Sequence, residues 1–513
     1  MTRIEIHNAV AILHTVPSVL GVVRHRVSYQ GVRLPPIEAQ KLIKRFLLEK
    51  GGGSMYSLME AIWEDADLSS ALQALGVGRS DLTMGGLGLI QKRKGGFWDG
   101  WMRPVAPDGS FPTGLLGHVQ RVLDVYCSAP YSIDDQRGPA PFGDPVGKPI
   151  ELWGFQQEAV EAFLAAGRGV VDLPPRSGKT RIAISVVCRL GLPTIFIVPS
   201  VGLARQTVQA FRAVLPAREV ASATGGRPSQ ARSREMTRAM VVIGTPKSVT
   251  YLPDIASRRV MVVDEFHHSA AETWRAVSYA ARSAYWRLGL TGTNYRADGH
   301  DMEMHGVLDR AVYRQTVGEM VARGRLVPAR IALLRIRGSS PGDYRRGVVQ
   351  HEERNAALAW AARCLLERGK RVLVLTKEVD HAKHLAAMTG GVQVDGEDGD
   401  AVEAALDLMR AGKLRCLVGT SVIGEGRDVP VADALVYAAG GRSPVKVKQD
   451  YFRALTAYPG KRFGIIIDAA DGQSVKLTEQ AADRLLLYRS EECFTADVIE
   501  QSGFLGWLEA VDR

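Results

Sequence analysis

The stretch "GVVDLPPRSGKTRIA" (residues 169–183) joins a short apolar run, a loop that ends in Gly178, Lys179 and Thr180, and the start of a helical pattern. Between a buried strand and a helix, the backbone N–H groups of such a loop and the amino end of the helix bind a phosphate group. The pattern G-x-x-x-x-G-K-[ST] asks for a glycine at position 173, where this chain has Leu173. Because the strand and the helix are both in place, we predict that Lys179 contacts the β- and γ-phosphates of a nucleotide and that Thr180 holds Mg²⁺.

A pair of acids supports this interpretation. Asp264 and Glu265 end the apolar run of "RVMVVDEFHH" (residues 259–268). An acid at the carboxyl end of a strand beside the phosphate loop can hold Mg²⁺, and its neighbour can orient and deprotonate an attacking water. We predict these roles for Asp264 and Glu265. The alternative, a surface acidic pair after an edge strand, is the weaker hypothesis given the phosphate loop upstream.

Short apolar runs recur from residue 168 onward and alternate with helical segments such as 179–190 and 351–369. This alternation is typical of buried parallel strands in βα units, so the sequence predicts two doubly wound parallel sheets. Pro328 precedes a new strand, which places the break between the sheets at about residue 329. We expect an α+β accessory domain at 1–145, the sheet domains at 146–328 and 329–490, and a helical tail at 491–513, with 136–149 as a Pro- and Gly-rich linker.

Composition limits the partners and the compartment. The 513 residues carry a net charge of +10, which favours a polyanionic partner, although a basic balance alone is often only a solubility feature. The five cysteines are far apart and form no C-x-x-C pair, which argues against a zinc ribbon and a disulfide framework. Polar residues interrupt the apolar stretch 10–23, and no other run approaches membrane-spanning length. We therefore expect a cytoplasmic protein with no membrane partner.

A series of segments extends this pattern along the chain. They are "LWGFQQEAV" (152–160), "LPPRSGKT" (173–180), "VPSVGLARQ" (198–206), "GTPKSV" (244–249), "DEFH" (264–267), "LTGTNYR" (290–296), "VGTSVIGEGRDVP" (418–430) and "QDYFRALT" (449–456). In this order they resemble motifs Q, I, Ia, Ib, II, III, V and VI of the superfamily 2 DExH-type helicases. Motif I of that superfamily often reads L-P-T-x-x-G-K-[ST], so the absent glycine is a family variation.

The resemblance implies two RecA-like lobes that use ATP and Mg²⁺. It implies the following roles: catalysis by Lys179, Asp264, Glu265 and Arg453; ATP binding by Gln156, Pro175, Ser177, Gly178, Lys179, Thr180, Gly426 and Asp428; Mg²⁺ binding by Thr180 and Asp264; coupling by His267, Thr291, Thr293 and Gln449; and DNA binding by Arg205, Thr245 and Thr420.

Motif VI departs from the family's Q-R-x-G-R-x-x-R. Gln449 and Arg453 are kept, but Thr456 replaces the final arginine. Arginines of this motif stabilise the charge that develops on the γ-phosphate during hydrolysis. Slow turnover would follow from the loss, unless Arg442 or Arg462 substitutes. A position of Arg453 on a solvated helix face is the weaker alternative, since Gln449 lies one turn before it.

The amino-terminal region carries a second resemblance. Its residues Trp98, Asp99, Gly100, Arg103, Gly114 and Leu115 resemble the amino-terminal module of the UvsW-type phage recombination helicases. This implies a phage-encoded protein that acts on branched DNA. We predict phosphate contacts for Lys92, Arg93 and Lys94, and for Trp98 either base stacking or an ordinary core position.

The resulting expectation is an ATP-dependent DNA helicase or translocase that remodels branched DNA in recombination and repair. It would act on branched, single-stranded or duplex DNA, with a nuclease or a recombination protein as a further partner. Three alternatives stay open: an RNA helicase, because the motor motifs do not read the sugar; an ATP switch with weak hydrolysis, because of Thr456; and the motor subunit of a restriction system whose nuclease lies in a partner.

Overall fold

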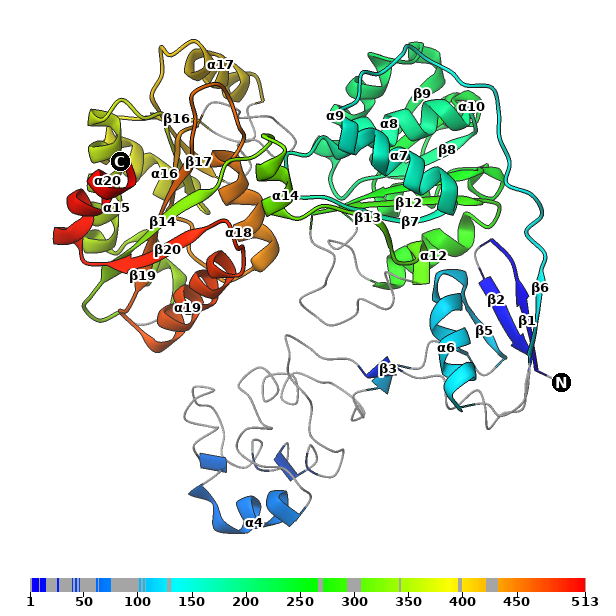
Figure 1. The fold of residues 1–513 in the computed structure, drawn as a ribbon, viewed down its shortest axis with the longest axis horizontal. Helices are drawn as coiled ribbons and strands as arrows, with labels where there is room; N and C mark the ends of the chain where they lie inside the picture. The colour runs from blue at the N-terminus through cyan, green and yellow to red at the C-terminus, as the bar shows by residue number, and fades with distance from the viewer. Residues whose placement is uncertain are drawn as a thin grey trace. The chain divides into compact units, whose positions relative to one another are not determined.

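The computed structural model describes most of the chain. The described residues are 2–8, 10–14, 25–26, 39, 42–43, 46, 61–62, 64–74, 101–102, 105–106, 108–126, 131–265, 271–292, 306–340, 343–394, 399–420 and 432–512. They form two compact units, 1–172 with 180–313 in one and 314–513 with the loop 173–179 in the other. Figure 1 shows a parallel sheet flanked by helices in each unit.

The first sheet has the order β13-β7-β12-β11-β8-β10-β9. Its strands are β7 (Arg168–Asp172), β8 (Thr194–Ile197), β9 (Val220–Ala223), β10 (Val241–Gly244), β11 (Val260–Asp264), β12 (Trp286–Thr291) and β13 (Ala311–Arg314). The pairs from β7 through β12, β11, β8 and β10 to β9 are parallel. The inner strands are buried along their whole length, as expected for Val- and Ile-rich strands covered on both faces.

Helices cover this sheet on both faces. They are α7 (Gly154–Ala166), α8 (Lys179–Leu190), α9 (Val201–Arg212), α10 (Gln230–Arg238), α11 (Pro246–Val249) and α12 (Ala271–Ala280). Met236 of α10, Val249 of α11 and Val277 of α12 share one buried cluster with alternate residues of the strands. On the other face, Phe211 of α9 stacks edge-on against Phe196 of β8 with ring centroids 5.5 Å apart.

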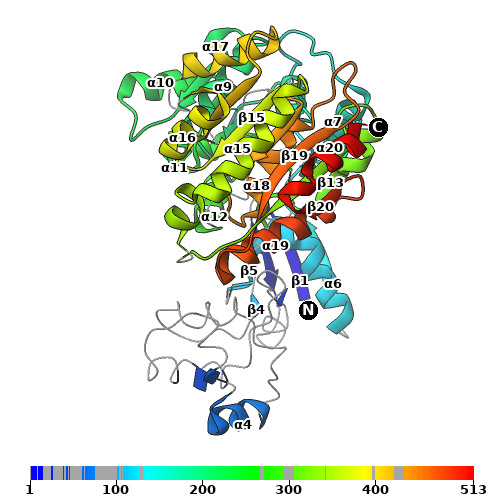
Figure 2. The same cartoon turned by 90° about the vertical axis from the view of Figure 1, so that its left-hand side faces the viewer.

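The second sheet has the order β16-β17-β15-β18-β19-β14-β20, and all its pairs are parallel. Its strands are β14 (Ala329–Ile336), β15 (Val372–Thr376), β16 (Val392–Gln393), β17 (Cys416–Thr420), β18 (Ala434–Tyr437), β19 (Gly464–Asp471) and β20 (Thr495–Ile499). Its helices are α14 (Val317–Ala322), α15 (Glu352–Glu367), α16 (Val379–Thr389), α17 (Gly399–Arg410), α18 (Pro444–Tyr451), α19 (Val475–Arg489) and α20 (Phe504–Asp512). Helices α15, α16 and α20 lie over one face (Figure 2), where they share a buried cluster with the strands.

The two sheets have the same strand order. When the strands of each sheet are numbered one to seven along the chain, both sheets read 7-1-6-5-2-4-3. Strands β7 and β14 are therefore equivalent first strands, β11 and β18 equivalent fifth strands, and β12 and β19 equivalent sixth strands. The predicted pair of doubly wound parallel sheets is confirmed.

A small sheet forms the amino-terminal domain. Its order is β5-β2-β1-β6, with β1 (Thr2–Ile6), β2 (Val10–His14), β5 (Ser110–Pro112) and β6 (Tyr131–Asp135). Helix α6 (Leu116–Tyr126) adds Val119 and Leu123 to a core that includes Ile4 and Phe111. Apart from this sheet, β3 (His25–Arg26) pairs with β4 (Trp101–Met102), and α4 spans Ala66–Ala74. The expected small α+β domain is thus confirmed.

Two segments differ from expectation. The Pro- and Gly-rich stretch 136–149 is bonded to the first sheet domain, because Gly143 N donates to Leu190 O and Trp286 Nε1 donates to Pro141 O, both over 2.8 Å. The stretch 491–513 is not purely helical, since it contains strand β20, which pairs with β14. In the described part of the chain, no helix is both long enough and apolar enough to cross a membrane.

Candidate nucleotide site

Three neighbouring strands of the first sheet bring the predicted nucleotide residues to one edge. Strand β12 lies between β7 and β11. Thr291 of β12 is opposite Asp172, the last residue of β7, and Leu290 of β12 is opposite Asp264, the last residue of β11. The loop after β7 and the acids at the end of β11 therefore start from the same carboxyl edge, where open α/β sheets bind ligands.

The phosphate loop has the backbone of an anion site. Arg176 and Gly178 have φ angles of +71° and +74°, and helix α8 begins at Lys179. Alternation of left- and right-handed residues turns successive N–H groups toward one concave side. Leu173 is fully buried, and its carbonyl accepts a hydrogen bond from Lys179 Nζ at 3.2 Å. Because Leu173 is not among the residues with positive φ, its backbone does not require the glycine that the general pattern places there.

The acidic pair has two different environments. Asp264 is 5% exposed at the end of β11. Glu265 has a φ of +47°, and its N–H extends the ladder by donating to Leu290 O at 3.0 Å. A left-handed conformation at a residue other than glycine costs about 1–3 kcal/mol and is concentrated at functional sites. The structure thus turns the chain sharply between the two carboxylates that the sequence singled out.

The residues at this edge fit ATP with Mg²⁺. The concave loop suits the phosphates, while the Thr180 hydroxyl and the Asp264 carboxylate are oxygen donors of the kind that Mg²⁺ prefers. The described residues include no group of three or more His, Cys, Asp or Glu side chains that could hold a metal alone. A magnesium ion here would rely on these two side chains and on phosphate oxygens, as in other phosphate-loop sites.

Gln156, predicted to bind adenine, has a structural role in this conformation. It lies in the first turn of α7 and is 1% exposed. Its Oε1 accepts a hydrogen bond from Trp153 N at 3.0 Å, which caps the helix. Adenine binding by Gln156 stays a prediction.

Motif VI lies on α18 and the short helix that follows it. Gln449 is partly buried on α18, whereas Arg453 is only 3% exposed. Arg453 Nη2 is 3.2 Å from Asp450 Oδ1, and Asp450 is itself buried. This ion pair was not predicted, although the spacing of three residues between the Asp and the Arg of "DYFR" is a signal for it. An arginine held in this way would have to exchange Asp450 for a phosphate before it could act in hydrolysis.

The two suggested substitutes differ in position. Arg442 is exposed and follows Gly440 and Gly441, whose φ angles are +63° and +84°, in the loop after β18. Arg462 Nη2 donates to Asp512 O in α20 at 2.9 Å. Of the two, only Arg442 lies at the carboxyl edge of its sheet.

The predicted DNA contacts lie on equivalent elements of the two sheets. Thr245 follows β10 and Thr420 ends β17, and both strands are fourth in their sheets. Thr245 Oγ1 donates to Ser248 Oγ at 2.9 Å, which ties it into the turn. Arg205 is exposed near the amino end of α9. The remaining predicted residues lie outside the described ones: Gly426, Asp428, His267, Thr293, Lys92, Arg93, Lys94 and Trp98.

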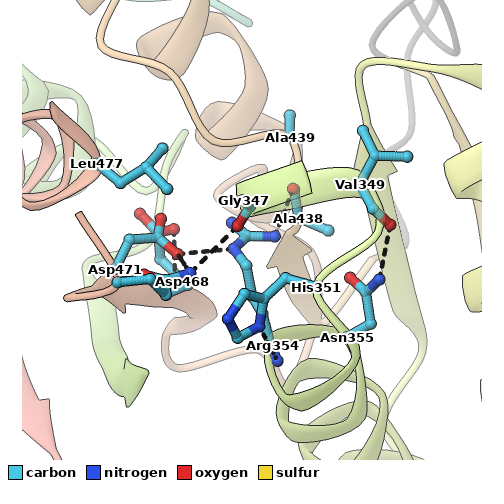
Figure 3. A network of polar contacts seen from close by, with 12 residues as sticks. Gly347, Val349, His351, Arg354, Asn355, Ala438, Ala439, Asp468, Asp471 and Leu477 are labelled. Atoms are coloured by element: carbon cyan, nitrogen blue, oxygen red, sulfur yellow. Dashed lines mark hydrogen bonds and ion pairs between the residues drawn. The ribbon is translucent and has the colours of Figure 1, made fainter. Parts of the chain in front are cut away.

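The carboxyl edge of the second sheet holds a buried ion-pair network that the sequence did not reveal. Arg354 of α15 donates through Nε to Asp471 Oδ1 at 2.7 Å and through Nη1 to Ala438 O at 3.0 Å, as Figure 3 shows. Arg484 of α19 donates to Asp468 Oδ2 at 2.8 Å and to Asp471 Oδ2 at 3.2 Å. Two arginines and two aspartates thus balance their charges at almost zero exposure.

Comparisons with known proteins agree on the class of fold and motor. Residues 149–296 match the family described as "Type III restriction enzyme, res subunit". The DNA 3'-5' translocase XPB2 of Sulfurisphaera tokodaii is 26% identical over 57% of this chain and 75% of its own length. The DNA 3'-5' helicases XPB of Mycobacterium tuberculosis and Kineococcus radiotolerans are each 25% identical over 56% of this chain. They are matched over 55% and 53% of their own length, so the chain spans about half of these relatives.

Among solved structures, the ATP-dependent Type ISP restriction-modification enzyme LlaBIII bound to DNA is similar with a TM-score of 0.53 and 14% identity. That alignment covers 76% of this chain and 36% of the enzyme, and it supports the fold. The T4 UvsW crystal structure aligns over 98% of this chain and 99% of its own, with a TM-score of 0.42 and 15% identity. A TM-score at that level carries no argument about function.

Proposed function

We propose that the chain is a superfamily 2 helicase, an ATP-driven motor that moves along DNA. The observation that carries this proposal is that two segments meet at one carboxyl edge of the first sheet, with β12 between their strands. Lys179 and Thr180 begin the helix that follows β7, and Asp264 and Glu265 end β11. A phosphate-binding loop and a paired acid at one edge suit hydrolysis of a phosphoanhydride.

The proposed roles follow from the chemistry of each group. Lys179 and the loop N–H groups hold the phosphates and stabilise the negative charge that develops on them. Thr180 and Asp264 would hold Mg²⁺, which would supply positive charge to neutralise the phosphates. Glu265 orients a water and takes its proton. Arg453 of the second sheet adds positive charge once it is released from Asp450.

The proposed track is DNA. The XPB-type relatives are named as DNA 3'-5' translocases and helicases, and the net charge of +10 suits a polyanion. We further propose branched DNA as the preferred substrate, on the resemblance of Trp98, Asp99, Gly100 and Arg103 to the UvsW-type module. RNA stays the alternative track.

A nucleic-acid-binding ATP switch is the second candidate. Its support is in motif VI, where Arg453 is buried against Asp450 and Thr456 replaces the final arginine. If Arg453 stays paired with Asp450, the chain would bind ATP and hydrolyse it slowly.

One set of assays separates these candidates. Steady-state ATP hydrolysis is measured for wild type and Glu265→Gln without nucleic acid and with single-stranded DNA, duplex, a four-way junction and RNA. Stimulation that is greatest with the junction and is lost in Glu265→Gln supports the proposal. Greatest stimulation with RNA supports the RNA alternative, and DNA binding without turnover supports the switch. Hydrolysis that persists in Glu265→Gln would contradict the proposed site.

A further inference from the structure

Lys461 lies in the loop after motif VI and binds three backbone carbonyls. Its Nζ donates to Ala432 O at 2.7 Å, to Ala454 O at 2.8 Å and to Thr456 O at 3.2 Å. Ala454 directly follows Arg453, whereas Ala432 directly precedes Asp433 and strand β18. The Lys461 side chain thus joins the end of motif VI to the segment that leads into strand β18.

Charged and aromatic side chains lie close to the Lys461 ammonium group. Asp433 accepts from Arg371 Nε at 3.0 Å and from the Tyr458 hydroxyl. The Tyr458 ring has the Arg371 guanidinium 4.9 Å from its centroid and Lys461 Nζ 5.0 Å from it. Such cation–π contacts position a cation without neutralising it. Asp433, Arg371 and Tyr458 are the titratable and charged groups that face Lys461.

The residues that Lys461 holds also pair with the segment that leads into β14. Val327 N donates to Leu455 O at 2.9 Å, and Ala457 N donates to Arg325 O at 3.2 Å. Thr456 forms an antiparallel bridge with Leu326. Thr456, where the family has its final arginine, is therefore part of a backbone ladder between motif VI and residues 325–327.

We propose that Lys461 is a positioning residue for motif VI, which fixes the segment 452–456, and with it Arg453, against Ala432 and residues 325–327. This inference rests on the proposed function, since it assigns Arg453 to ATP hydrolysis. The hydrogen bonds of Lys461 go to Ala454, Thr456 and Ala432, so its effect on hydrolysis passes through the motif VI backbone.

The protonation state of Lys461 gives the inference a measurable signature. An ammonium has three N–H donors for the three carbonyls, whereas a neutral amine has two. Burial lowers the pKa of Lys461 to about 7, against the opposing effect of Asp433. As pH rises through this value, one carbonyl loses its donor and motif VI loosens. Arginine at this position stays charged at every accessible pH.

The test compares four proteins: wild type, Lys461→Met, Lys461→Arg and Lys413→Met. Methionine keeps an unbranched apolar side chain and removes the donor group. Lys413 is exposed after α17, so its replacement controls for loss of one charge. DNA-stimulated kcat and the KM for ATP are measured from pH 6 to 9. Hydrogen exchange of the Val327 and Ala457 amides reports the ladder without reference to activity.

We expect Lys461→Met to lower kcat by about 10- to 100-fold with little change in KM, because a small misplacement of a catalytic group is that costly. Exchange at Val327 and Ala457 should become faster. Wild-type kcat should fall above pH 7, and Lys461→Arg should keep activity and lose that fall.

Three results would overturn the inference. Unchanged kcat and unchanged exchange in Lys461→Met would show that motif VI does not depend on this residue. An equal decline of Lys461→Arg and wild type above pH 7 would assign the pH dependence elsewhere. Absence of DNA-stimulated hydrolysis in wild type would contradict both the proposed function and this inference, whereas active wild type with unaffected Lys461→Met contradicts the inference alone.

Discussion

The two sheets share one strand order but have opposite chemistry at their carboxyl edges. In the first sheet, the loop after the first strand is a short anion cradle, residues 173–179, and the fifth strand ends in Asp264. In the second, the segment between the first strand and the next helix is longer and contains a π-helix, Arg345–Val349. Arg354 at the start of that next helix pairs with Asp471 at the end of the sixth strand. The ion pair is 0% and 1% exposed.

The difference shows that the fold positions a site without creating it. Equivalent strands deliver equivalent loops, but the side chains in those loops decide whether an edge binds a ligand or closes on itself. The first edge turns backbone N–H groups and a lysine toward a concave loop. At the second edge, two buried arginines pair with two aspartates, so the charges of these four side chains balance one another.

The largest effect should come from Arg453 of motif VI, to which the helicase resemblance assigns a role in ATP hydrolysis. Arg453→Ala should lower DNA-stimulated ATP turnover by about 10³-fold or more, because such arginines stabilise the transition-state charge. ATP affinity should stay close to that of wild type. Arg442→Ala is the matched control, from the same segment and exposed. If Arg442→Ala lowers ATP turnover more than Arg453→Ala does, Arg442 is the residue that acts in hydrolysis and Arg453 has a structural role.

A large effect on stability should come from the second edge. Arg354→Met should lower the free energy of unfolding by about 3–5 kcal/mol, because it leaves two buried carboxylates, Asp468 and Asp471, with one arginine, Arg484. Urea unfolding measures this, with Arg345→Met as a control whose side chain is 64% exposed. The added change Asp471→Leu should recover part of the loss. A loss of under 1 kcal/mol would show that the Arg354 ion pair does not stabilise the fold.

A moderate, pH-dependent effect should come from His381 of α16, behind the same network. Its Nε2 is 2.9 Å from Asn355 Oδ1, and burial, followed by the charge of Arg354, lowers its pKa to about 3. The unfolded chain binds this proton below pH 6.5, but the folded chain does not, so stability is lost as pH falls from 6.5 toward 3. The slope should approach about 1.4 kcal/mol per pH unit. Urea unfolding of His381→Gln between pH 4 and 7 should show a shallower slope, and an equal slope would assign the effect to other groups.

The smallest effect should come from a single DNA contact on the first sheet. Arg205→Ala should weaken DNA binding about equally for all sequences and reduce the slope of log affinity against log salt by about 1. Binding is measured by fluorescence anisotropy at several salt concentrations. Arg218, which is 86% exposed just before β9 at the amino edge, is the control. An equal effect of Arg218→Ala would place the DNA elsewhere.

Local patterns made the first edge readable from sequence. The apolar run before Asp172, the Gly-Lys-Thr triplet and the Asp264–Glu265 pair each lie within a few residues of a strand end, and the superfamily 2 prediction built on them is confirmed. The alternation of strands and helices in the sequence also predicts two parallel sheets, and the structure contains both.

Long-range pairs made the second edge unreadable. Arg354 and Asp471 are 117 residues apart, and nothing near either residue marks the other as its partner. The same holds for Lys461 and Ala432, which are joined through a carbonyl that every residue has. The capping role of Gln156 and the pairing of β20 with β14 also depend on the folded context.

The most direct test of this account is ATP binding and DNA-stimulated hydrolysis in Lys179→Ala beside Arg354→Met. If the nucleotide site lies at the first edge, Lys179→Ala loses hydrolysis and binds ATP weakly while its unfolding curve matches wild type. Arg354→Met, at a temperature where it is folded, binds ATP as wild type does. Normal ATP binding and hydrolysis in Lys179→Ala, or loss of ATP binding in folded Arg354→Met, would contradict the assignment of the site to the first sheet.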